Sequence, residues 1–178
     1  MPSRCIDLRE ALPTHPTKVY GSRSMGDIVR IGVHHVGLPP MGRGVEYFAR
    51  QTAAYCINTR DFPGGAYQIV LAVDGEWALC YSLTTVTYGM ANINGSSVHI
   101  CCEGDYRTEP VPLVMVDSLL EIVLWIIHER NVWAEDTGNA TRQLQVVGHC
   151  LAPNQQTLCP GAQGLVAVKE IRRRVYWT

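Results

Sequence analysis

The chain has 178 residues, of which 47% are hydrophobic and 17% charged; this balance excludes a disordered chain and a coiled coil. The formal net charge of −1 argues against wholesale binding to nucleic acid or to an anionic membrane. No run of 18 apolar residues is present, so we expect no membrane span.

The first 27 residues are predicted to form an arm on a single domain that comprises residues 28–178. Prolines and glycines break this arm into turns, at Pro13, Pro16, Gly21 and Gly26. Its first 13 residues include several charges and lack the apolar run of a secretory signal. We therefore expect synthesis in the cytoplasm, with most of the seven cysteines as reduced thiols.

Short β-prone runs and longer segments with helical spacing follow one another along the chain. Five runs are predicted strands, and the turn at Asp74-Gly75 is predicted to join two of them as a hairpin. The predicted strands are residues 28–35, 66–73, 76–83, 98–102 and 143–148. The predicted helices are residues 45–57, 113–131 and 164–175. This pattern predicts an α/β fold with a mixed central sheet flanked by helices.

Three side chains of metal-ligand type follow predicted strands or lie in a nearby loop. His34 is near the end of the first predicted strand, His149 follows the last one, and Cys159 lies in a polar loop further on. Zinc binds imidazole nitrogen and thiolate sulfur well, and three protein ligands with an open fourth position are typical of catalytic sites. From composition and spacing alone, the alternative is buried histidines beside an ordinary cysteine.

Four short blocks, in chain order, resemble a known family. They are residues 31–40 (IGVHHVGLPP), 65–70 with Asp74-Gly75, 97–100 with 104–106, and Gly148-His149 followed by 157–161. In this order the chain resembles the zinc-dependent N-acetylmuramoyl-L-alanine amidase type 2 family over about residues 19–175. That family includes phage endolysin amidases, bacterial amidases and animal peptidoglycan-recognition proteins.

The resemblance implies roles for five residues. His34, His149 and Cys159 match the family's ligands to zinc (Zn2+). Tyr67 matches a tyrosine that lies near the metal in active relatives. Thr157 occupies a position where relatives carry Lys or Thr next to the scissile carbonyl. Tyr67 or Thr157 is therefore expected to stabilise the developing oxyanion.

Several neighbouring residues receive other assignments. His35 is not expected to share the metal, because consecutive residues of a regular strand point to opposite faces. Cys101 stands where relatives often carry glutamate, so a carboxylate base there is in doubt, and Glu103 is not chosen in its place. Cys150 is interpreted as a buried core thiol rather than an alternative ligand. His99 is interpreted as a packed strand residue.

The implied function is zinc-dependent hydrolysis of the amide bond between N-acetylmuramic acid and L-alanine in peptidoglycan. We expect a bacteriolytic, antimicrobial enzyme of the endolysin kind, monomeric, that reaches the cell wall after release by lysis or a holin. Its partner would be peptidoglycan, with no nucleic acid and no membrane.

Two alternatives stay open. One is a recognition module that binds peptidoglycan without catalysis, although such relatives typically lack the cysteine ligand. The other is a metal-free hydrolase with Cys159 or Cys150 as nucleophile and His149 as base.

Overall fold

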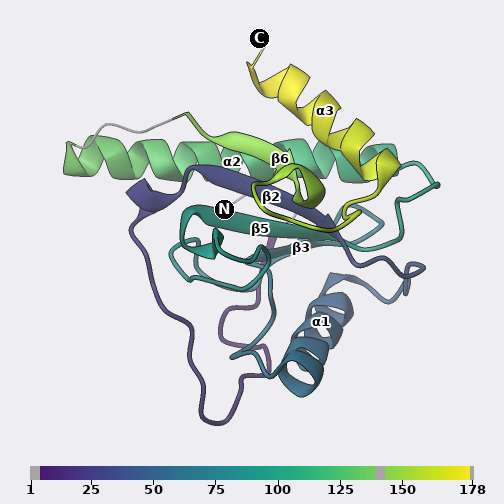
Figure 1. The fold of residues 1–178 in the computed structure, drawn as a ribbon, viewed down its shortest axis with the longest axis horizontal. Helices are drawn as coiled ribbons and strands as arrows, with labels where there is room; N and C mark the ends of the chain where they lie inside the picture. Colours follow the sequence, from purple (N-terminus) through teal and green to yellow (C-terminus); the bar gives the residue numbers. More distant parts are fainter. Residues whose placement is uncertain (1–4, 139–142, 177–178) are drawn as a thin grey trace.

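A mixed six-stranded sheet, with strand order β1-β4-β3-β5-β2-β6, forms the centre of the molecule (Figure 1). The computed structural model describes residues 5–138 and 143–176. Within these residues the strands are β1 (Cys5–Asp7), β2 (Arg30–His35), β3 (Ile69–Leu71), β4 (Trp77–Leu79), β5 (Ser97–Cys102) and β6 (Gln145–Gly148). Only β3 and β4 pair in antiparallel fashion, and the other neighbours are parallel.

Helices cover both faces of this sheet, so the predicted α/β class and mixed sheet are confirmed. Helices α2 (Leu113–Thr137) and α3 (Ala162–Tyr176) lie on one face, and α1 (Val45–Arg60) lies on the other (Figure 1). In the described part of the chain, no helix is both long and apolar enough to cross a lipid bilayer.

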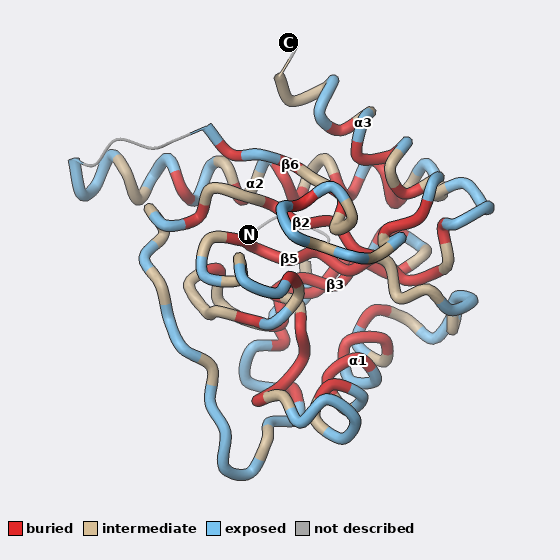
Figure 2. The backbone as a smooth tube through the Cα atoms, viewed as in Figure 1, coloured by how far each residue is buried: buried red, intermediate tan, exposed pale blue. Residues whose placement is uncertain are grey.

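The two central strands, β2 and β5, have different side chains on their two faces. Ile31, Val33, Val98 and Ile100 are buried in the apolar cluster that packs against α2 and α3. The opposite face carries Gly32 and His34 of β2, which stand opposite His99 and Cys101 of β5 in the parallel register. Figure 2 shows that β2, β5 and β3 are largely buried. The apolar face forms the main core, and the other face places two histidines inside the protein.

The structure differs from the sequence-based expectation around β1 and β3. Residues 5–7, within the expected arm, form an edge strand of the sheet parallel to β4. The strand expected at 66–73 spans only Ile69–Leu71. Its pairing with β5 ends there because the backbone N–H of His99 donates to the side chain of Gln68, at 2.8 Å, instead of to a strand carbonyl. Tyr67 therefore lies in a loop before β3 and not in a strand.

The other boundaries differ at the ends of the elements. The strand expected at 76–83 is limited to Trp77–Leu79. Helix α2 continues six residues beyond the expected end, until Gly138 terminates it in the left-handed conformation, with φ of 66°. The antiparallel hairpin expected around Asp74-Gly75 is present as β3 and β4.

The carboxylate of Glu103, just after β5, ties three segments together. It is buried, and it accepts hydrogen bonds from the backbone N–H groups of Met41 at 2.7 Å, Gly42 at 3.3 Å and Val73 at 3.1 Å. Bonds to a charged acceptor are stronger than neutral ones. Glu103 therefore holds the loop after β2 against the ends of β3 and β5.

Replacing Glu103 by glutamine should destabilise the fold by about 2 kcal/mol, because the amide has one acceptor oxygen and its NH2 group would face a backbone donor. Urea unfolding of Glu103→Gln measures this loss. The exposed Glu109 offers the matched control, and Glu109→Gln should unfold as the wild type does. Equal midpoints for the two variants would show that the three backbone contacts contribute nothing.

Candidate metal centre

Three side chains converge where β2 and β6 end. The two strands run parallel with Val33 opposite Gly148, so His34 of β2 lies beside His149, the first residue of the 3-10 turn η3 (His149–Leu151). Nδ1 of His34 is 3.1 Å from Nδ1 of His149 and 3.8 Å from Sγ of Cys159. All three ligand atoms lie within 4.8 Å of one another. The residues that the sequence singled out are thus brought together.

This spacing suits a tetrahedral zinc ion. With Zn–N bonds of about 2.0 Å and Zn–S bonds of about 2.3 Å, tetrahedral geometry requires about 3.3 Å between nitrogens and about 3.5 Å between nitrogen and sulfur. The two separations measured from Nδ1 of His34 are close to these values, and two imidazoles with one thiolate form a donor set that zinc favours. The residues present therefore fit zinc.

Backbone contacts hold the Cys159 loop against the strand ends. The backbone N–H of Cys150 donates to the carbonyl of Cys159 at 2.7 Å, and that of His35 donates to the Cys159 sulfur at 3.4 Å. Burial raises the pKa of the Cys159 thiol to about 12. The thiol is therefore protonated at neutral pH in the metal-free protein, and a bound cation would favour the thiolate.

Gln155 determines which ring nitrogen of His149 carries the proton. Its side-chain N–H group donates to the carbonyls of Ala91 at 2.8 Å and Pro153 at 3.0 Å, which turns its oxygen towards Nε2 of His149, 3.1 Å away. His149 is thus the donor through Nε2, and its Nδ1 keeps a lone pair for a metal. Burial lowers the pKa of His149, which also favours the neutral ligand form. The sequence analysis missed Gln155, whose only signal was its place in the polar loop.

His34 is completely enclosed. Burial, together with the neighbouring His99 and His149, holds its pKa well below the usual range, so the ring is neutral. Its Nε2 lies 3.3 Å from Nδ1 of His99. The expectation that His99 is packed within a strand is met, and in addition His99 contacts a ligand. Burial also lowers the pKa of His99, to about 3.

Tyr67 lies next to His34, and Thr157 lies next to Cys159. The ring centroids of Tyr67 and His34 are 5.1 Å apart, and burial beside Cys101 and Cys159 raises the pKa of the Tyr67 phenol well above its usual value. The phenol therefore stays protonated and can donate a hydrogen bond. Thr157 accepts a hydrogen bond from the backbone N–H of Cys159 at 3.2 Å. Its catalytic role stays a prediction, as does that of Tyr67.

The other residues weighed from the sequence are not part of the group of three metal-ligand candidates. His35 points elsewhere, as expected, and its Nδ1 accepts from the backbone N–H of Tyr106 at 3.0 Å. Cys101 is fully buried, and burial raises its pKa well above the usual value, so it cannot replace a carboxylate base near neutral pH. The expectation of a buried core thiol at Cys150 is wrong, because this residue is partly exposed in the turn η3.

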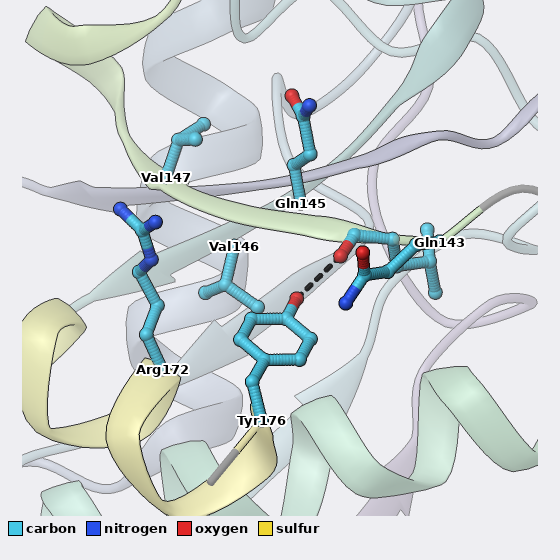
Figure 3. Close-up of a pocket in the computed structure, with 7 residues that line it drawn as sticks. Gln143, Gln145, Val146, Val147, Arg172 and Tyr176 are labelled. Carbon is cyan, nitrogen blue, oxygen red and sulfur yellow. Dashed lines mark hydrogen bonds between the residues drawn. The ribbon is translucent and has the colours of Figure 1, made fainter.

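A separate cavity of about 490 Å³ lies at the free edge of β6 (Figure 3). Residues of β6 and the C-terminal part of α3 line it, and the hydroxyl of Tyr176 donates to the carbonyl of Leu144 at its side. None of the three ligand residues lines this cavity.

Residues 24–162 match the family described as N-acetylmuramoyl-L-alanine amidase. No curated protein is significantly similar to the chain in sequence.

Solved structures of low sequence identity share the fold over nearly the whole chain. A Drosophila PGRP-LB tyrosine-to-phenylalanine mutant in complex with tracheal cytotoxin is 18% identical, with 98% of this chain and 96% of that chain covered and a TM-score of 0.77. The amidase LysC from Clostridium intestinale is 17% identical, with 98% of both chains covered and a TM-score of 0.70. Peptidoglycan recognition protein-LE in complex with tracheal cytotoxin is 18% identical, with 96% and 94% covered and a TM-score of 0.73.

Replacing Cys159 by serine should weaken zinc binding by about 100-fold or more, because a serine hydroxyl stays protonated and is a poor zinc ligand. The fold should persist, since the side chain contributes little to the core. Competition with a chelating dye measures the zinc affinity, and thermal unfolding of the metal-free protein checks the fold. Cys150→Ser is the matched control and should bind zinc like the wild type. Equal zinc affinity of Cys159→Ser and the wild type would remove Cys159 from the ligand set.

Proposed function

The chain belongs to the N-acetylmuramoyl-L-alanine amidase family, and we propose that it is a zinc-dependent enzyme that hydrolyses the amide bond between N-acetylmuramic acid and L-alanine in peptidoglycan. One observation carries the proposal: the ligand atoms of His34, His149 and Cys159 converge within 4.8 Å. Two of the similar structures contain tracheal cytotoxin, described as a monomeric diaminopimelic acid-type peptidoglycan. A peptidoglycan fragment is therefore the substrate class we propose for this chain.

Zinc and two side chains of the protein would have separate roles in hydrolysis of the scissile amide. Zinc, when bound to two neutral imidazoles and one thiolate, would supply Lewis acidity at the amide carbonyl and at an attacking water. The Tyr67 phenol, which stays protonated, would donate a hydrogen bond to the oxyanion that develops on the carbonyl. Thr157 lies two residues before Cys159, and its hydroxyl would be a second donor to the oxyanion.

The geometry favours this reading over the two alternatives. A module that only recognises peptidoglycan has no need of a third ligand, whereas Cys159 is present and held by two backbone contacts. A metal-free cysteine hydrolase needs a thiolate, but burial raises the pKa of Cys159 to about 12 and also raises the pKa of Cys150. We further propose that the enzyme acts as a monomer on the bacterial cell wall after cell lysis.

Digestion of purified peptidoglycan by the zinc-loaded protein tests the function. Mass analysis of the fragments should find stem peptides with a new free amino group on L-alanine, together with intact glycan strands. A chelator should abolish the release, and added zinc should restore it. Binding of peptidoglycan without any cleavage would support the recognition module instead. Cleavage that survives the chelator would support the cysteine hydrolase.

Replacing Tyr67 by phenylalanine removes the hydroxyl and keeps the ring, so it distinguishes a catalytic role of Tyr67 from a packing role. The ring stays in place, so zinc content should match the wild type, and the stability loss should be at most about 1 kcal/mol. Turnover should fall about 100-fold or more, the scale of losing one oxyanion donor. Zinc content, melting temperature and turnover are measured on one preparation. Unchanged turnover with intact zinc would exclude Tyr67 from the mechanism.

A further inference from the structure

His99 of β5 is a buried histidine whose ring meets the ring of the ligand candidate His34. Nδ1 of His99 lies 3.3 Å from Nε2 of His34, and the two rings are edge-on, with centroids 5.3 Å apart. Gly32 stands opposite His99 in the strand register, and its lack of a side chain leaves space for the side chains of His34 and Met90. A Cβ at position 32 would lie only 3.3 Å from Nε2 of His34 and 2.2 Å from the methyl group of Met90.

The protein fixes His99 from two further sides. The side-chain oxygen of Gln68 accepts its backbone N–H at 2.8 Å, and Gln68 in turn donates to the carbonyl of Thr85 at 2.7 Å. Gly89 packs directly on the ring, since a Cβ there would lie 2.5 Å from Cγ of His99. The ring therefore has little freedom to turn away from His34.

The position of the protons follows from the geometry. A neutral imidazole has one N–H and one bare nitrogen. Nδ1 of His34 faces His149 and Cys159, so a metal bound there takes the lone pair of Nδ1 and leaves the proton of His34 on Nε2. That N–H points at Nδ1 of His99, which accepts it only when the proton of His99 is on its own Nε2.

Nε2 of His99 is not stabilised by a hydrogen bond with any residue that the structure describes. This nitrogen is also buried. A buried unpaired N–H lowers stability, so an apolar side chain would serve the fold better at this position. The advantage of a histidine here must come from its other nitrogen, which faces His34.

We propose that His99 is a positioning residue of the metal centre, whose Nδ1 accepts the Nε2–H of His34 and holds the Nδ1 of His34 towards His149 and Cys159. The inference rests on the metal site of the proposed function. Metal-ligating histidines commonly donate their second nitrogen to a carboxylate, a carbonyl or a water. Here His34 donates to an imidazole and His149 donates to the amide oxygen of Gln155. Both acceptors are uncharged, so neither reduces the positive charge of a bound zinc ion.

Two substitutions of His99 separate hydrogen bonding from packing. His99→Phe keeps an aromatic ring but removes the acceptor, and its zinc affinity should fall about 10- to 100-fold, the usual loss when a partner of a ligand is removed. His99→Asn places an oxygen near the position of Nδ1, and its zinc affinity should stay within about threefold of wild type. Met90→Leu is the packing control, because Met90 adjoins the same space, and it should bind zinc normally.

Zinc competition with a chelating dye, and the melting temperature of each metal-free variant, provide the two readouts. Weaker zinc binding by His99→Phe with an unchanged or higher melting temperature supports the positioning role. A lower melting temperature with wild-type zinc affinity would show a purely structural histidine and overturn the proposal. If the wild type itself binds no zinc, the proposed function fails as well, which distinguishes the two failures.

The zinc-loaded wild type gives an answer that needs no variant. Long-range proton–nitrogen NMR correlations identify which ring nitrogen carries the proton in each histidine. His34 and His99 should both carry it on Nε2. A His99 ring that carries its proton on Nδ1 cannot accept from His34, and this result would overturn the proposal even if His99→Phe failed to fold.

Discussion

The parallel pairing of β2 with both β5 and β6 is the constraint on which the candidate site depends. Parallel strands end at the same edge of a sheet, so residues far apart in the sequence meet where these strands stop. With Val33 opposite Gly148, His34 and His149 become neighbours without any special loop. The same pairing places His99 beside β2 on the face that carries His34. A shift of one residue in either pair would turn these side chains to the opposite face.

The division of the sheet into two faces explains how polar groups can be buried at its centre. One face packs a continuous apolar cluster against α2 and α3, which supplies the hydrophobic stabilisation. The other face can then hold His34 and His99, whose facing nitrogens lie 3.3 Å apart. His34 has one nitrogen towards His149 and the other towards His99. The arrangement keeps every ring neutral, which is the form that binds a metal.

The sequence predicted the parts that depend on local patterns. Short β-prone runs and turn residues located β2, β5 and the hairpin, and a resemblance to the amidase family selected His34, His149 and Cys159. The missed features depend on contacts across the chain. His99 contacts His34, which is 65 positions away in the sequence, and Gln155 is oriented by Ala91, which is 64 positions away. Tyr67 was expected in a strand because nothing local shows that a Gln68 side chain ends the pairing of β3 with β5.

The central claim is that His34, His149 and Cys159 hold one zinc ion, and anomalous diffraction at the zinc absorption edge tests it most directly. Crystals of the zinc-loaded protein should give a single strong anomalous peak within bonding distance of Nδ1 of His34, Nδ1 of His149 and Sγ of Cys159. A peak at His35 or Cys150 instead, or no ordered zinc at all in protein saturated with the metal, would contradict the account.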